Sequence, residues 1–102
     1  DRVEGDGALA RKMATRFLES APGLLTGLEE SSRAFDAGAL ARHAHSLKGS
    51  AATLGGCRVQ EACQRLETAV RDGKNQDAKG MIAEVQREAG ELEKELKKFA
   101  EA

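Results

Sequence analysis

The residue types that can carry out chemistry gather in one segment, residues 44–55, around His45, Lys48 and Gly49. A neutral imidazole is a nucleophile, and a phosphoryl group placed on it would bring nearly two negative charges. On a helix, Lys48 lies three residues beyond His45, so its ammonium can reach a group attached to the ring. Gly49 leaves the backbone bare one turn from the histidine, although glycine costs a helix up to about 1 kcal/mol. These residues predict a histidine beside a cation that could partly neutralise a phosphoryl group, with room for a large partner.

A helical wheel predicts that His45 faces solvent. Leu47 lies about 200° from His45 at roughly 100° per residue, so burial of Leu47 places the imidazole outside. The face around the histidine carries two cations and little other bulk: Ala41, Arg42, Lys48, Gly49 and Ala52. Arg42 and Ala52 are therefore supporting candidates, although Arg42 is either a residue that steers an acidic partner or ordinary surface. His43 lies about 200° from His45 and is expected to be structural.

The segment after Gly56 is expected to fold back on this helix as an antiparallel hairpin. In that geometry residue i faces roughly residue 112 − i, which places Glu67 level with His45 and Gln64 level with Lys48. Glu67 could then accept a hydrogen bond from one ring nitrogen, which would fix the tautomer and leave the other nitrogen as the nucleophile. Gln64 and Glu67 are therefore predicted to support the site.

Four amphipathic helices are expected to position these residues, over approximately residues 7–35, 37–54, 57–72 and 76–102. Asp36 and Asn75 are candidate N-caps, and Gly55–Gly56 and Gly73 supply turns. Pro22 lies inside the first helix, where a break or a kink is expected because proline removes a helix hydrogen bond.

Apolar residues at helical spacing mark the buried face of each helix. The stripes are Ala10, Met13, Phe17, Ala21, Leu24, Leu28 and Phe35; Leu40, Ala44, Leu47, Ala51 and Leu54; Val59, Cys63, Leu66 and Val70; and Ile82, Val85, Ala89, Leu92, Leu96 and Phe99. Packing four stripes together removes them from water, so the sequence predicts an all-α fold, an antiparallel up-down four-helix bundle. The 102 residues are expected to form a single domain, in which residues 1–6 are a linker or a frayed N-terminus.

Composition argues against several classes of function. The net charge of −1 and the absence of Trp and Tyr disfavour a nucleic-acid binder. No apolar stretch approaches the roughly 20 residues of a membrane span, so no membrane contact is expected. There is no Gly-rich phosphate loop and no acidic metal cluster. We therefore expect no bound cofactor or metal, no ATP binding and no autophosphorylation, and hence no enzyme in its own right.

Cys57 and Cys63 are expected to be reduced thiols of a cytoplasmic protein, because a disulfide within one helix is geometrically implausible. A zinc site formed by these cysteines with His43 and His45 is not expected, since its ligands would have to converge from alternating sides of two helices. The chain begins at Asp1 rather than Met, which favours a piece of a larger chain over a stand-alone protein.

The motif His45-x-x-Lys48-Gly49, followed by Leu54-Gly55, resembles the signature of histidine-containing phosphotransfer (HPt) domains. The Leu66-Glu67 step and the four helices also resemble that family, and the resemblance covers nearly the whole chain. It implies a phosphocarrier in a multistep His–Asp phosphorelay of two-component signalling. Such a domain accepts a phosphoryl group from an aspartate of one receiver domain and passes it to another.

Carried over to this sequence, the resemblance makes His45 the phosphorylated nucleophile, Lys48 the phosphate-stabilising cation and Gly49 the gap that admits the receiver. The family often has Gln at the position of Glu67, where a carboxylate can orient the imidazole but would repel the phosphate. Family members often keep one long helix across the region of Pro22, which favours a kink. Chemotaxis-kinase phosphotransfer domains share the His-x-x-Lys-Gly core.

The resemblance also implies partners. Response-regulator receiver domains would supply the aspartate and the Mg²⁺ ion, and the rest of a hybrid sensor histidine kinase is a further candidate partner. A monomer is expected, because the bundle can bury its own apolar stripes. The alternative is a helical-bundle docking or dimerisation module that carries no phosphate.

Overall fold

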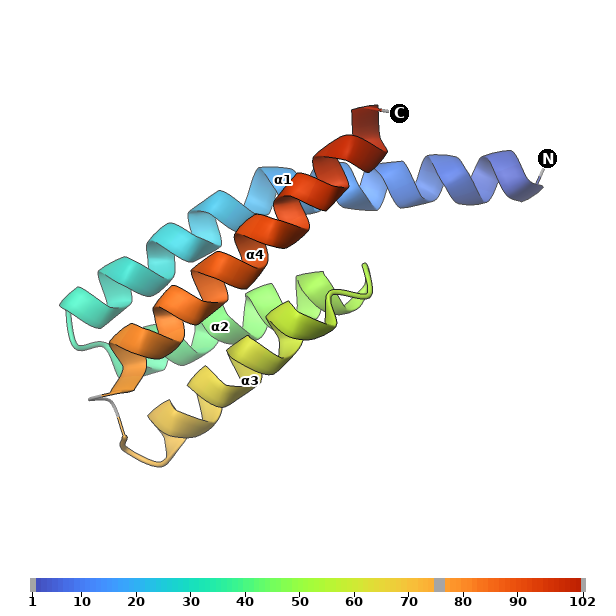
Figure 1. The fold of residues 1–102 in the computed structure, drawn as a ribbon. Coiled ribbons are helices and arrows are strands. Elements are labelled where there is room, and N and C mark those ends of the chain that lie inside the picture. Colours follow the sequence, from blue (N-terminus) through green and yellow to red (C-terminus); the bar gives the residue numbers. More distant parts are fainter. Residues whose placement is uncertain (1, 75–76, 102) are drawn as a thin grey trace.

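The computed structural model describes residues 2–74 and 77–101 and has four helices in an up-down antiparallel bundle (Figure 1). They are α1 (Arg2–Arg33), α2 (Ala37–Ala52), α3 (Cys57–Arg71) and α4 (Ala78–Glu101). Each helix packs against its neighbours in sequence, and α4 closes the bundle against α1, so that α2 and α4 are diagonal to each other. The predicted fold class is confirmed. The candidate N-cap Asn75 lies outside the described residues.

Helix α1 is longer at its N-terminus than expected and is not broken. It begins at Arg2, so residues 2–6 continue the helix, and Pro22 lies within it. Proline has no N–H for the carbonyl four residues before it, and such a gap bends a helix. Figure 1 shows that the axis of α1 changes direction along its length and that its N-terminal part extends beyond α2 and α3.

The turns after α2 and α3 have the same hydrogen-bond pattern. After α2, Gly56 N–H donates to the Ala51 carbonyl (2.9 Å) and Gly55 N–H donates to the Ala52 carbonyl (3.2 Å). These are the two bonds of a Schellman motif, which requires a left-handed residue just past the helix. Gly55 has a φ of 69° and Gly73, after α3, has a φ of 75°. Glycine therefore ends both helices, as predicted.

Phe35 occupies the corresponding position after α1, with a φ of 55°. Asp36 N–H donates to the Ser31 carbonyl (2.9 Å), as in the other turns. The helix ends at Arg33 and Phe35 is 94% exposed, so the prediction that both the helix and its apolar stripe reach Phe35 was wrong. The chain turns there because Asp36 caps α2: its carboxylate accepts a hydrogen bond from Ala39 N–H at 3.0 Å, as predicted.

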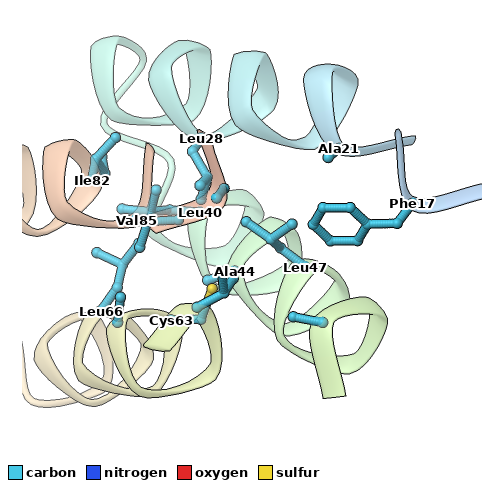
Figure 2. Close-up of a cluster of buried hydrophobic side chains, with 14 of the residues drawn as sticks. Phe17, Ala21, Leu28, Leu40, Ala44, Leu47, Cys63, Leu66, Ile82 and Val85 are labelled. Carbon is cyan, nitrogen blue, oxygen red and sulfur yellow. The ribbon is translucent and has the colours of Figure 1, made fainter. Parts of the chain in front are cut away.

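Apolar side chains from all four helices meet in the centre of the bundle (Figure 2). The largest fully buried side chains are Leu28, Leu47, Leu66, Val59, Val85 and Cys63. The predicted stripes of α2, α3 and α4 supply most of this core, whereas Phe99 stays exposed and Val70 is half-buried. In α1, Ala14 and Ser31 are buried and Met13 is only half-buried. The buried residues of α1 recur at heptad spacing, and one of them is a serine.

A polar contact joins α1 to α2 at this heptad. Ser31 Oγ donates to the Gly27 carbonyl (2.7 Å) and lies 3.3 Å from His43 Nδ1. His43 Nδ1 also lies 2.8 Å from the Ala39 carbonyl. Because a carbonyl can only accept, this nitrogen carries the proton and donates. His43 is therefore a packing residue, as expected.

Gly27 provides the space for the His43 ring, since a Cβ at this position would lie 2.6 Å from Cδ2 and Nε2 of the imidazole. We predict that Gly27→Ala lowers the free energy of unfolding by about 1–3 kcal/mol, because the ring must move out of a packed contact. Gly23→Ala is the control in the same helix. Its Cβ would meet nothing within 4 Å, so stability should rise by up to about 1 kcal/mol. Equal shifts in chemical melts of the two variants would contradict this packing.

Candidate functional site

The residues predicted to form the functional site lie on the hairpin of α2 and α3. Its register is the expected one: His45 on α2 contacts Glu67 on α3, and Lys48 contacts Gln64. The turn at Gly55 favours this register, because the two hydrogen bonds of its Schellman motif end α2 and reverse the chain within a few residues. The structure thus brings four of the predicted residues into one cluster.

The imidazole of His45 is exposed but held in place. Its side chain is 71% exposed, and Nδ1 lies 3.3 Å from Glu67 Oε2. When the ring is neutral and the carboxylate is ionised, this contact requires a proton on Nδ1, since an ionised carboxylate only accepts. The lone pair is then on Nε2. The exposed ring therefore carries a defined nucleophilic nitrogen.

Glu67 also binds the cation of the site. Lys48 Nζ lies 2.7 Å from Glu67 Oε1 and donates to Gln64 Oε1 at 3.0 Å. Gln64 is oriented in turn by donating from Nε2 to Thr68 Oγ1 (3.2 Å). Glu67 Oε1 is shielded from water, and the ammonium near it lacks the geometry of a directional hydrogen bond. The carboxylate and the ammonium thus neutralise each other, while Lys48 stays within reach of the imidazole.

The outer face of α2 beside the imidazole is bare. A Cβ on Gly49 would meet nothing within 4 Å, and Ala52 is a small exposed residue one turn further along the helix. Arg42 is exposed on the preceding turn. In the part of the chain that the structure describes, Arg42 makes no hydrogen bond or ion pair with His45. A large partner can therefore approach His45 from this side.

A shallow groove of about 570 Å³ extends from His45 to α1. Its α2 wall consists of His45, Ser46, Gly49, Ser50 and Thr53, and its α1 wall of Met13, Arg16, Phe17 and Ser20. The α1 wall was not predicted, because the pairing of α1 with α2 is a tertiary contact that no local spacing reveals. The sequence offered one signal for this wall, the cation Arg16 at helical spacing from Met13 and Ser20.

Cys63 lies buried one turn before Glu67 on α3. Burial, and to a smaller extent the Glu67 charge, raise the pKa of its thiol to about 12, and the Lys48 charge opposes this shift. Cys57 is exposed, and both cysteines are free. Among residues 2–74 and 77–101, no group of three or more His, Cys, Asp or Glu side chains is placed to hold a metal ion. No helix in these ranges is long and apolar enough to cross a membrane.

The family model described as the Hpt domain matches residues 12–102. The matched region includes the entire α2–α3 hairpin with His45 and most of α1. The chain matches no curated protein and no solved structure at a significant level.

The two cysteines should differ sharply in reactivity. A thiolate is the reactive form, and a pKa raised to about 12 by burial keeps the Cys63 thiol protonated through neutral and mildly alkaline pH. We predict that iodoacetamide at pH 8 alkylates Cys57 in the folded protein and leaves Cys63 intact, and that both react in denaturant. Peptide mass spectrometry measures each site. Modification of Cys63 at a similar rate in the folded protein would mean that α3 does not bury this thiol.

Proposed function

The chain belongs to the Hpt domain family, and from this premise we propose that His45 is the residue that carries the phosphoryl group. An Hpt domain has a phosphotransfer role in a His–Asp phosphorelay and is a transfer intermediate that interacts with receiver domains. One observation carries the assignment: an exposed imidazole is held at Nδ1 by Glu67, next to a helix face left open by Gly49.

In the proposed mechanism, Nε2 of His45 attacks the phosphorus of an aspartyl phosphate on a receiver domain. The P–N bond forms as the P–O bond breaks, and the aspartate leaves as a carboxylate. Attack by the aspartate of a second receiver reverses these steps and passes the group on. The receiver would supply a Mg²⁺ ion, whose charge would neutralise the transferring group.

Glu67 and Lys48 have opposite tasks in this mechanism. Attack through Nε2 leaves the ring with a proton on Nδ1 and a developing positive charge, which the Glu67 carboxylate stabilises at 3.3 Å. The ammonium of Lys48 can turn from Glu67 to the incoming phosphoryl oxygens, since it is only partly buried. A protonated ring is also a good leaving group, so Glu67 favours onward transfer over storage of the phosphate.

The assignment of His45 is tested by phosphoryl transfer from a labelled, phosphorylated receiver domain. We predict acid-labile, alkali-stable label on the native chain and none on His45→Gln, because a phosphohistidine has this stability pattern whereas phosphoserine and an aspartyl phosphate do not. His43→Gln, the variant of the other histidine, should keep the label if circular dichroism shows that it is folded. A folded native chain that takes no label from a broad panel of receivers would favour the docking or dimerisation module instead.

The role of Glu67 is tested by removing its charge without changing its shape. We predict that the phosphohistidine of Glu67→Gln is hydrolysed about fivefold more slowly than that of the native chain. The substitution removes the charge that stabilises a positive ring and frees Lys48 to bind the phosphate, a change of about 1 kcal/mol for two unit charges roughly 4 Å apart in water. Glu61→Gln, at an exposed position of α3, makes the same change in net charge. Equal half-lives of the two labelled variants would exclude the Glu67 charge from the mechanism.

A further inference from the structure

The ammonium of Lys48 has two ligands on α3, and they differ in geometry. Gln64 Oε1 accepts a directional hydrogen bond from Nζ at 3.0 Å. Glu67 Oε1 lies closer to Nζ, at 2.7 Å, but accepts no hydrogen bond of good geometry from the described residues. A carboxylate attracts a cation from any direction, whereas a hydrogen bond fixes where its donor points. The neutral amide of Gln64, rather than the charge of Glu67, therefore sets the direction of the ammonium.

Gln64 is itself held by a second contact on α3. Its Nε2 donates to Thr68 Oγ1 at 3.2 Å, one turn further along the helix. An amide has one accepting end and one donating end, and an ammonium only donates. Lys48 therefore requires Oε1 on its side, and the Thr68 hydroxyl accepts from the opposite end of the same amide. Gln64 is exposed and Thr68 is half-buried, so the hydroxyl restrains a side chain that would otherwise rotate freely in solvent.

These contacts become important when a phosphoryl group arrives at His45. In the proposed mechanism, the ammonium of Lys48 turns from Glu67 to the phosphoryl oxygens. An ammonium has three N–H donors, so Lys48 can keep its bond to Gln64 while the other donors change partners. Because Gln64 is uncharged, it attracts the ammonium less strongly than a phosphoryl group with nearly two negative charges does. Gln64 can thus hold the cation in place without keeping it from the phosphate.

We propose that Thr68 is a positioning residue of the phosphotransfer site, which acts through Gln64 to keep the ammonium of Lys48 within reach of the imidazole. This inference rests on the proposed function and deepens it. Gln64 is the fixed point about which the ammonium turns from the carboxylate to the phosphate, and Thr68 restrains that point. Thr68 therefore acts on the chemical step and on the lifetime of the phosphohistidine, but not on association with the receiver.

The test measures transfer from a labelled receiver and the half-life of the phosphohistidine in matched variants. Thr68→Val removes the hydroxyl and keeps the shape of the side chain. It should lower kcat and shorten the half-life by about threefold each, with an unchanged KM for the receiver, because one hydrogen bond is lost. Thr68→Ser restores the hydroxyl and should restore both values.

Thr15→Val is the matched control, because it also removes a threonine hydroxyl from the surface of a helix. Thr15 Oγ1 donates to a backbone carbonyl one turn earlier on α1, at 2.9 Å. Thr15 lies two heptads before Glu29, whose carboxylate contacts Gln86 on α4, so it lies on the side of α1 towards α4. This variant should behave like the native chain. In a Lys48→Met background, Thr68→Val should have no further effect, because the group that it positions is absent.

The outcomes separate this inference from the function on which it rests. Equal kcat values and half-lives for Thr68→Val and Thr15→Val would overturn the positioning role and leave the phosphocarrier intact. A loss that Thr68→Ser does not restore would also overturn it, because the hydroxyl would then not be the group that acts. So would an undiminished loss in the Lys48→Met background, since Thr68 would then act without the ammonium. Absence of label on the folded native chain would overturn both proposals.

Discussion

A single carboxylate, that of Glu67, holds both basic groups of the site, and this is possible only if α3 lies against α2 in one register. A shift of one residue would move the carboxylate by about 1.5 Å along α3 and about 100° around it, away from His45 and Lys48. The short turn at Gly55 disfavours such a shift. A Cβ on Gly56 would lie 2.9 Å from Leu92 and 3.2 Å from Ala51, so the turn is also packed against α4. The geometry around the imidazole therefore depends on the packing of a loop far from it.

The same helix α2 serves the core and the site with opposite faces. Leu40, Ala44, Leu47 and Ala51 are buried, and this fixes the rotation of the helix so that His45 points outwards. The thiol of Cys63 is buried one turn before Glu67 on α3, and its raised pKa keeps it protonated. Rigid packing below and a bare surface above give His45 a fixed nitrogen that remains open to a large partner.

The sequence was sufficient for features that depend on neighbours along the chain. The Asp36 cap, the glycine turns and the level of Glu67 opposite His45 all follow from local spacing. The sequence was not sufficient for features that tertiary packing determines. The serine at position 31 is buried because it can donate to Gly27, and Phe35 leaves the core because the α1–α2 turn needs a left-handed residue. The α1 wall of the groove is likewise set by how two helices pair.

The three short turns have a consequence for how the chain folds. They place helices that are consecutive in sequence next to each other, and only the pairing of α1 with α4 joins distant parts of the chain. Local contacts require little loop-closure entropy, and proteins rich in them fold fast. The α2–α3 hairpin can thus form from one contiguous segment, whereas α1 and α4 must find each other across the whole domain. The reactive groups are therefore expected to acquire their register early in folding, and the closure of the bundle to come last.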